Sequence, residues 1–143
     1  MHKPGKVLFL VPYPLKRAPS QRFRVELFLP HLAAKNIDYK IAPFLDVRTF
    51  SVLYGKASPV QKLWGIIKGF LRRFWIVLFE AHRYNYIFVH REASPIGPPI
   101  FEFLLSRIFR KRIIYDFDDA IWIPDSSNKL LNWETKKQFN KII

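Results

Sequence analysis

The 143-residue sequence predicts a single α/β domain, Rossmann-like and doubly wound, with a mainly parallel sheet flanked by helices. Short apolar runs, typical of strands buried on both faces, alternate along the chain with longer segments of helical spacing. Half of the residues are apolar, which suits a globular protein with a substantial core. There is no cysteine, so neither a disulfide framework nor a thiolate metal site is available.

The first third of the chain predicts one β-α-β unit. Lys6 to Val11 is an apolar run closed by prolines, which predicts a buried strand. Ser20 is expected to cap a helix that Pro30 kinks or ends early. The apolar positions of that helix are Phe23, Leu27, Phe28 and Leu32. Apolar and polar residues alternate over residues 37–42, which predicts a second strand nearer a sheet edge. Residues 43–59 have turn chemistry and no period, so we expect them to be irregular.

The rest of the chain continues the alternation. Val60 to Arg83 predicts a long helix with a broad apolar face. A buried strand over Tyr86 to Val89 follows, then a helix from the proline-rich turn to about Lys111, and then a strand over Ile113 to Tyr115. Residues 132–143 begin a helical pattern that stops without a cap. We therefore expect one domain over residues 1–143, truncated near its C-terminal end.

The net charge of +13 predicts an anionic partner: nucleic acid, a phospholipid surface or a phosphorylated substrate. Residues 47–79 contain six Lys or Arg residues and no acid. Nucleic acid is disfavoured because the aromatic residues lie on apolar helix faces, and do not alternate with basic residues on an exposed sheet. The N-terminal apolar stretch is too short for a signal peptide.

The helix predicted over Val60 to Arg83 has two interpretations. Cations in its middle would each cost about 2.5–3.5 kcal/mol inside a bilayer, so it does not span a membrane. Its apolar face either packs on the sheet or lies in the interface of an anionic membrane. The residues expected at such a membrane surface are Lys62, Trp64, Lys68, Arg72, Arg73 and Trp75.

Three polar clusters follow predicted strands, at the sheet edge where open α/β folds bind ligands. They are Ser20, Arg22 and Arg24; His90, Arg91 and Glu92; and Asp116, Asp118 and Asp119. Each cluster also has a structural interpretation, as a helix cap, a local ion pair or a buried histidine. The acidic cluster could hold Mg²⁺ or Mn²⁺, but it could equally cap a helix or pair with the basic loop, and we expect no metal.

Fingerprints of several enzyme classes are missing from the sequence. There is no Gly-x-Gly-x-x-Gly, no Walker lysine loop, no His-Glu-x-x-His and no nucleophile elbow. A dinucleotide oxidoreductase and a phosphate-loop ATPase are thereby disfavoured.

Three stretches carry a resemblance to a known family. They are Lys6 to Pro12 with the following Ser20 to Arg24, then Tyr86 to Gly97, and most specifically Ile113 to Trp122. Together they resemble the N-terminal domain of group 1 (family 4) glycosyltransferases of GT-B architecture. The resemblance implies transfer of a sugar, with retention of configuration, from a nucleotide sugar to a lipid-linked, cell-envelope glycan or small-molecule acceptor. It also implies a cytoplasmic location at the inner face of the plasma membrane, no metal and no cofactor beyond the donor substrate.

The resemblance further implies that this domain supplies the acceptor side of a cleft, while a C-terminal domain, not present in this sequence, binds the donor. Its first polar cluster (Ser20, Arg22, Arg24) would line the cleft, its second (His90 to Glu92) would face the sugar or acceptor, and its third (Asp116, Asp118, Asp119) would shape the floor. Pro12 and Pro14 stand where many relatives have glycines. The chain alone is expected to be inactive. The alternative is a noncatalytic module that binds a membrane surface or a partner.

Overall fold

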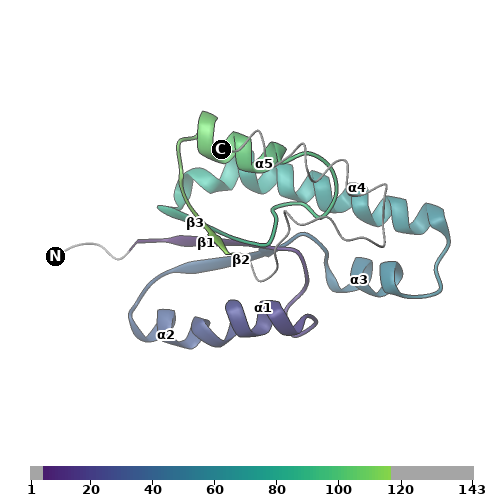
Figure 1. Ribbon diagram of the computed structural model, residues 1–143, viewed down its shortest axis with the longest axis horizontal. Helices are drawn as coiled ribbons and strands as arrows, with labels where there is room; N and C mark the ends of the chain where they lie inside the picture. Colours follow the sequence, from purple (N-terminus) through teal and green to yellow (C-terminus); the bar gives the residue numbers. More distant parts are fainter. Residues whose placement is uncertain (1–4, 117–143) are drawn as a thin grey trace, which may run out of the picture.

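The computed structural model describes residues 5–116, and four parallel strands form one sheet within them (Figure 1). They are β1 (Val7–Val11), β2 (Tyr39–Pro43), β3 (Tyr86–His90) and β4 (Arg112–Asp116). Their order is β2-β1-β3-β4, so β1 and β3 are central. The expected α/β fold with a parallel sheet is confirmed, and so is the edge position of β2. The helix predicted over residues 132–143 lies outside the described residues.

Helical segments cover both faces of the sheet. On one face lie α1 (Pro19–Arg24), a 3₁₀ turn (Glu26–Phe28) and α2 (Leu29–Ala34), and on the other lie α4 (Pro59–Trp75) and α5 (Ile100–Phe103), while α3 (Val47–Tyr54) packs against α4 (Figure 1). Turns of π-helix (Ile76–Glu80) and 3₁₀-helix (Ala81–Arg83) prolong α4, and a π turn (Leu104–Ile108) prolongs α5. None of the helices within residues 5–116 is both long enough and apolar enough to cross a bilayer.

The core is divided by the sheet, because side chains alternate between the two faces of each strand. Leu8 and Leu10 of β1 join a cluster with residues of α5 and of the turn after α4. Phe9 and Val11 pack with Val25 in a smaller cluster on the α1 and α2 side. Both faces of β1 are therefore buried, as its continuous apolar run predicts.

The helix expected from Ser20 to Leu32 is interrupted, and Ser20 does not cap it. The first helix begins at Pro19, after Ala18, which makes no side-chain cap hydrogen bond. The chain leaves helical geometry at Val25 (φ −123°), which shifts the phase of the segment that follows. Pro30 lies in the first turn of α2, where proline is tolerated, so the segment breaks before it.

The interruption also changes which side chains face the sheet. Three of the predicted core positions are exposed: Phe23 by 64%, Leu27 by 50% and Phe28 by 57%. Val25 and Leu29 contact the core in their place, and Leu32 packs there as predicted.

Residues 43–59 are not irregular, because they contain α3. Asp46 caps this helix by accepting a hydrogen bond from the Thr49 backbone N–H at 2.7 Å. Burial opposes the charge of Asp46, but the Thr49 hydrogen bonds and the nearby Arg72 outweigh that effect and lower its pKa. This cap fixes the start of α3, a helix that no long apolar periodicity in the sequence indicates.

The long helix predicted over Val60 to Arg83 is confirmed in extent, since α4 and its two following turns end at Arg83. A capping box between Ser58 and Gln61 begins it. Two glycines face inwards: an added Cβ would lie 2.6 Å from Thr49 Cγ2 at Gly65 and 2.6 Å from Phe44 Cε1 at Gly69. The glycines thus allow α4 to approach α3 and the end of β2 closely.

Candidate functional site

The sheet has a topological switch point between β1 and β3. The chain runs from β1 outwards to β2, and then crosses back to β3 on the other side of β1. In open parallel sheets ligands bind at such a point, outside the carboxyl ends of the strands. The loops that follow Val11 and His90 flank it.

Arg24, His90 and Asp116 meet at this edge, one from each of the three predicted polar clusters. His90 and Asp116 are register partners at the ends of β3 and β4. The His90 Nδ1 atom lies 2.9 Å from Asp116 Oδ2, and the Arg24 guanidinium lies 3.1 Å from Asp116 Oδ1. Asp116 therefore joins α1 to the two neighbouring strands.

His90 is fully buried, whereas half of the Arg24 side chain is exposed. A carboxylate only accepts hydrogen bonds, so Nδ1 of His90 carries the proton that Asp116 accepts. The other ring nitrogen, Nε2, is buried and has no hydrogen-bond partner among the described residues. In this arrangement His90 positions the Asp116 carboxylate and does not reach a ligand directly.

The loop after β1 is held in place by Gln21, a fully buried residue of α1. Its side-chain oxygen accepts from the Tyr13 backbone N–H (3.1 Å), and its side-chain amide donates to the Tyr13 carbonyl (3.0 Å). Glu26 accepts from the same amide and from the backbone N–H of Lys16, which has a positive φ of 64°. These contacts fix the path of the loop beside the switch point.

Tyr13 belongs to this loop, and its ring packs against Phe50 of α3 with 5.9 Å between the ring centroids. Burial, with a hydrogen bond to Tyr54, raises the pKa of Tyr13 to about 12, although the positive charge of Arg91 acts in the opposite direction. The phenol is therefore protonated throughout the physiological pH range, and its hydroxyl is engaged with Tyr54. Arg91 adopts φ 63°, an uncommon value for a residue other than glycine, and its backbone N–H donates to the Asp116 carbonyl.

Glu102 fixes the loop after β3 from the other face of the sheet. Its Oε1 accepts from the Ala93 backbone N–H (2.9 Å) and from the Tyr115 hydroxyl (3.0 Å). Burial, together with the charge of Glu102, raises the pKa of Tyr115 far above its ordinary value. The loop that carries Arg91 and Glu92 is therefore anchored to both α5 and β4.

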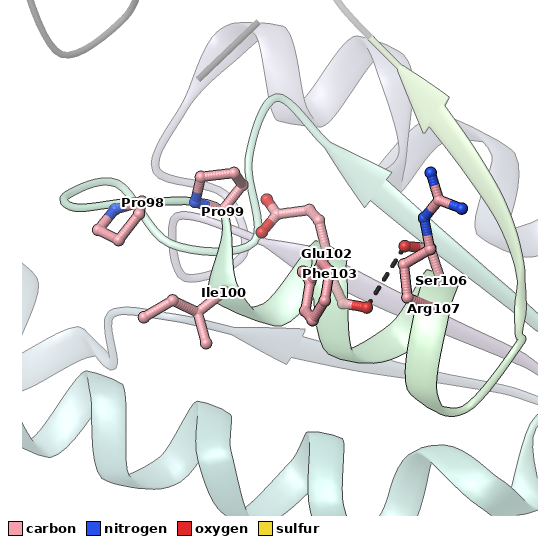
Figure 2. Close-up of a pocket in the computed structure, with 7 residues that line it drawn as sticks. All are labelled: Pro98, Pro99, Ile100, Glu102, Phe103, Ser106 and Arg107. Carbon is pink, nitrogen blue, oxygen red and sulfur yellow. Dashed lines mark hydrogen bonds between the residues drawn. The ribbon is translucent and has the colours of Figure 1, made fainter. Parts of the chain in front are cut away.

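A cavity of about 280 Å³ lies beside α5, on the far side of the same loop (Figure 2). It is lined by Pro98, Pro99, Ile100, Glu102, Phe103, Ser106 and Arg107. Glu102 is 8% exposed; its Oε1 is occupied by Ala93 and Tyr115, whereas its Oε2 is buried and has no hydrogen-bond partner among the described residues. The cavity is mainly apolar and is separate from the Asp116 cluster.

Arg73 was predicted to lie at a membrane surface, and this prediction is wrong. The side chain is 1% exposed and donates to the carbonyls of Ala42 (2.9 Å) and Val11 (3.0 Å), at the ends of β2 and β1. Burial lowers its pKa to about 9, so the guanidinium is still charged at neutral pH. Arg72 also turns inwards and donates to the Phe44 carbonyl.

The other predicted site residues are placed as follows. Ser20 is half-buried and Arg22 is exposed, both on α1, and Glu92 is exposed in the loop after β3. Asp118 and Asp119 lie outside the described residues. Within residues 5–116, no group of three or more His, Asp or Glu side chains is placed to hold a metal ion.

Three residues near the site were not predicted from the sequence: Tyr13, Gln21 and Glu102. Tyr13 immediately follows β1 and its Pro12, so its position at a strand end was a usable signal. Gln21 and Glu102 lie in helical segments, where polar residues are usually solvent-exposed, and no local pattern marks them as buried.

Comparison of the chain with family models, with curated proteins and with solved structures finds no match.

Proposed function

We propose that this chain is the acceptor-side domain of a retaining glycosyltransferase of GT-B architecture. The observation that carries the proposal is the Asp116 carboxylate, held between Arg24 and His90 at the switch point of a parallel sheet. The sequence resemblance to group 1 (family 4) enzymes falls on the same three segments. Sugar transfer is the activity that accounts for both.

The side chains at this edge suit a ligand rich in hydroxyl groups. Sugar hydroxyls both donate and accept hydrogen bonds, so a fixed carboxylate and a fixed guanidinium side by side recognise neighbouring hydroxyls. The Tyr13 hydroxyl, which is hydrogen-bonded to Tyr54, can still accept a hydrogen bond, and Arg91 and Glu92 follow directly after β3. In this proposal Asp116, Arg24 and Tyr13 contact the acceptor, and His90 positions Asp116.

The donor would be bound by a second Rossmann-like domain, in the same polypeptide or in a partner chain. The segment after β1 has no glycine-rich phosphate loop, so nothing in it favours a nucleotide on this domain. The proposal therefore predicts that residues 1–143 bind a saccharide and do not transfer sugar alone.

A glycan array tests the saccharide site. Fluorescently labelled wild-type chain, Arg24→Gln and Asp116→Asn are applied to immobilised oligosaccharides, with Lys35→Gln, directly after α2, as a charge-matched control. Circular dichroism first establishes that each variant is folded. We expect binding by the wild type and the control, and at least tenfold weaker binding by the two site variants, since a hydrogen bond to a charged group contributes about 1.5–3 kcal/mol.

A transfer assay tests the division between donor and acceptor domains. The purified chain is incubated with UDP-glucose or GDP-mannose and the glycans that it binds, and we expect no product. Robust transfer would contradict the half-enzyme proposal. Failure to bind any saccharide would favour the alternative, a noncatalytic binding module.

A further inference from the structure

The side of α4 that points away from the sheet is apolar. We define the outer face of α4 by five residues: Leu63, Trp64, Ile67, Leu71 and Trp75. Their spacing of three or four residues places them on one side of the helix. Ile67 is 37% exposed, and the other four are between 58% and 63% exposed. Contiguous exposed apolar surface of this kind marks an interaction site.

The inner side of the same helix explains why the apolar side faces outwards. Gly65, Gly69 and Arg73 face the strand ends and α3, where the two glycines allow close approach and Arg73 binds two strand carbonyls. Turning the helix over would bury Trp64 and Leu71 where no space exists and would break both hydrogen bonds that Arg73 donates. Close packing thus fixes the orientation of the outer face.

Around the outer face cations outnumber acids, and one acid, Asp46, lies near Lys68 and is paired with Arg72. Residues 47–79 contain no acid. The cations nearest the sheet are already occupied, since Arg73 is buried and Arg72 binds Phe44 and Asp46. Lys68 remains exposed at the margin of the outer face, with its Nζ 5.8 Å from the ring of Trp64.

This combination is complementary to an anionic lipid surface. Tryptophan side chains favour the boundary between headgroups and acyl chains, and a lysine at that level is attracted by anionic headgroups. A helix of 17 residues is about 26 Å long and can lie flat in the interface. A second copy of the chain is a poorer occupant, because pairing through this face would bring two Lys68 side chains together, while Asp46, the acid near each of them, is already paired with Arg72.

We infer that the outer face of α4 docks onto an anionic phospholipid bilayer, with Leu63, Ile67 and Leu71 in the acyl boundary and Lys68 at the headgroups. The inference is independent of the saccharide site. Arg24→Gln is expected to bind vesicles as the wild type does. Failure of saccharide binding and failure of membrane docking can therefore be detected separately.

Vesicle co-sedimentation tests this docking. The full chain is mixed with vesicles of phosphatidylcholine alone or with one quarter phosphatidylglycerol, at low and high salt. We expect salt-sensitive binding to the anionic vesicles. Leu71→Gln should lower the partition coefficient by at least about tenfold, because a leucine side chain is no longer buried. Lys68→Gln should lower it about fivefold, the value for one cation near an anionic surface.

Matched variants on the opposite side of the molecule provide the controls. Phe23 on α1 and Leu27 in the following turn are also at least half exposed, on the other face of the sheet. Phe23→Gln and Leu27→Gln should leave vesicle binding unchanged, and circular dichroism establishes that every variant is folded. Equal losses in these controls, or no binding to anionic vesicles, would overturn the inference. A dimer seen by light scattering that Leu71→Gln converts to monomer, without vesicle binding, would identify the face as a self-interface instead.

Discussion

Replacing Asp116 with alanine should destabilise the domain mainly through His90. The imidazole is fully buried, and its Nδ1–H donates to Asp116 at 2.9 Å, so the variant leaves a buried donor unpaired at a cost of about 1–3 kcal/mol. The Arg24 side chain is 47% exposed, and its ion pair with Asp116 adds at most about 1 kcal/mol. The total expected loss is about 1–4 kcal/mol, most of it from the histidine.

Urea unfolding followed by circular dichroism measures this loss, with Arg24→Ala as the comparison. Arg24→Ala should cost less than about 1 kcal/mol. A third variant, His90→Leu combined with Asp116→Ala, should recover part of the stability, since removing both partners leaves no buried donor unpaired. The reasoning is refuted if Arg24→Ala is as destabilising as Asp116→Ala, or if the double variant is less stable than Asp116→Ala alone.

Three other substitutions test the structure around the site. Gly69→Ala should lower the free energy of unfolding, because the added Cβ would lie 2.6–3.0 Å from three Phe44 ring atoms. This clash outweighs the gain in helix propensity of about 1 kcal/mol. In a Phe44→Leu background the same substitution should raise the free energy of unfolding measured in urea. Asp46→Ala should cost about 0.5–2 kcal/mol at pH 7 as a lost cap of the Thr49 N–H. The folded-state pKa of Asp46 is lowered, so this difference from wild type should persist above the ordinary value of 3.8 and shrink as the pH falls below it. In an ultraviolet titration of the folded chain, Tyr13→Phe should abolish the ionisation of one tyrosine at about pH 12. A titration curve identical to that of the wild type would contradict the burial of the Tyr13 phenol.

The strands could be predicted because each is a short run whose burial follows from its place in the sheet. Both faces of β1 are buried, since Leu10 packs in the core cluster on one side and Phe9 in the cluster on the other. The unbroken apolar run of β1 indicates this double burial. β2 lies at an edge, and residues 37–42 alternate accordingly. By contrast α3 depends on one local cap, from Asp46 to Thr49, and a pair of that kind is too common in sequences to predict a helix.

The convergence of Arg24, His90 and Asp116 could be anticipated, because carboxyl ends of parallel strands share one edge. Their arrangement could not be anticipated. The place of His90 at a strand end does not show that its side chain is fully buried, and no local pattern marks the break at Val25 that ends α1. Gln21 is a polar helix residue whose buried contacts with Tyr13 depend on the path of a neighbouring loop.

The orientation of α4 shows why an amphipathic pattern does not by itself say which side is the inside. A pattern of apolar residues identifies a face that avoids water, but the sheet below α4 offers two strand-end carbonyls and little room. Arg73 and the glycines match those two conditions, so the outer face of α4 points away from the sheet, while Phe70 and Phe74 pack inwards against Phe101. Since α1 and α4 cover opposite faces of the sheet (Figure 1), a bilayer against the outer face of α4 would leave the exposed part of Arg24 accessible from water. Membrane docking and ligand binding at the Asp116 edge are therefore compatible on one small domain.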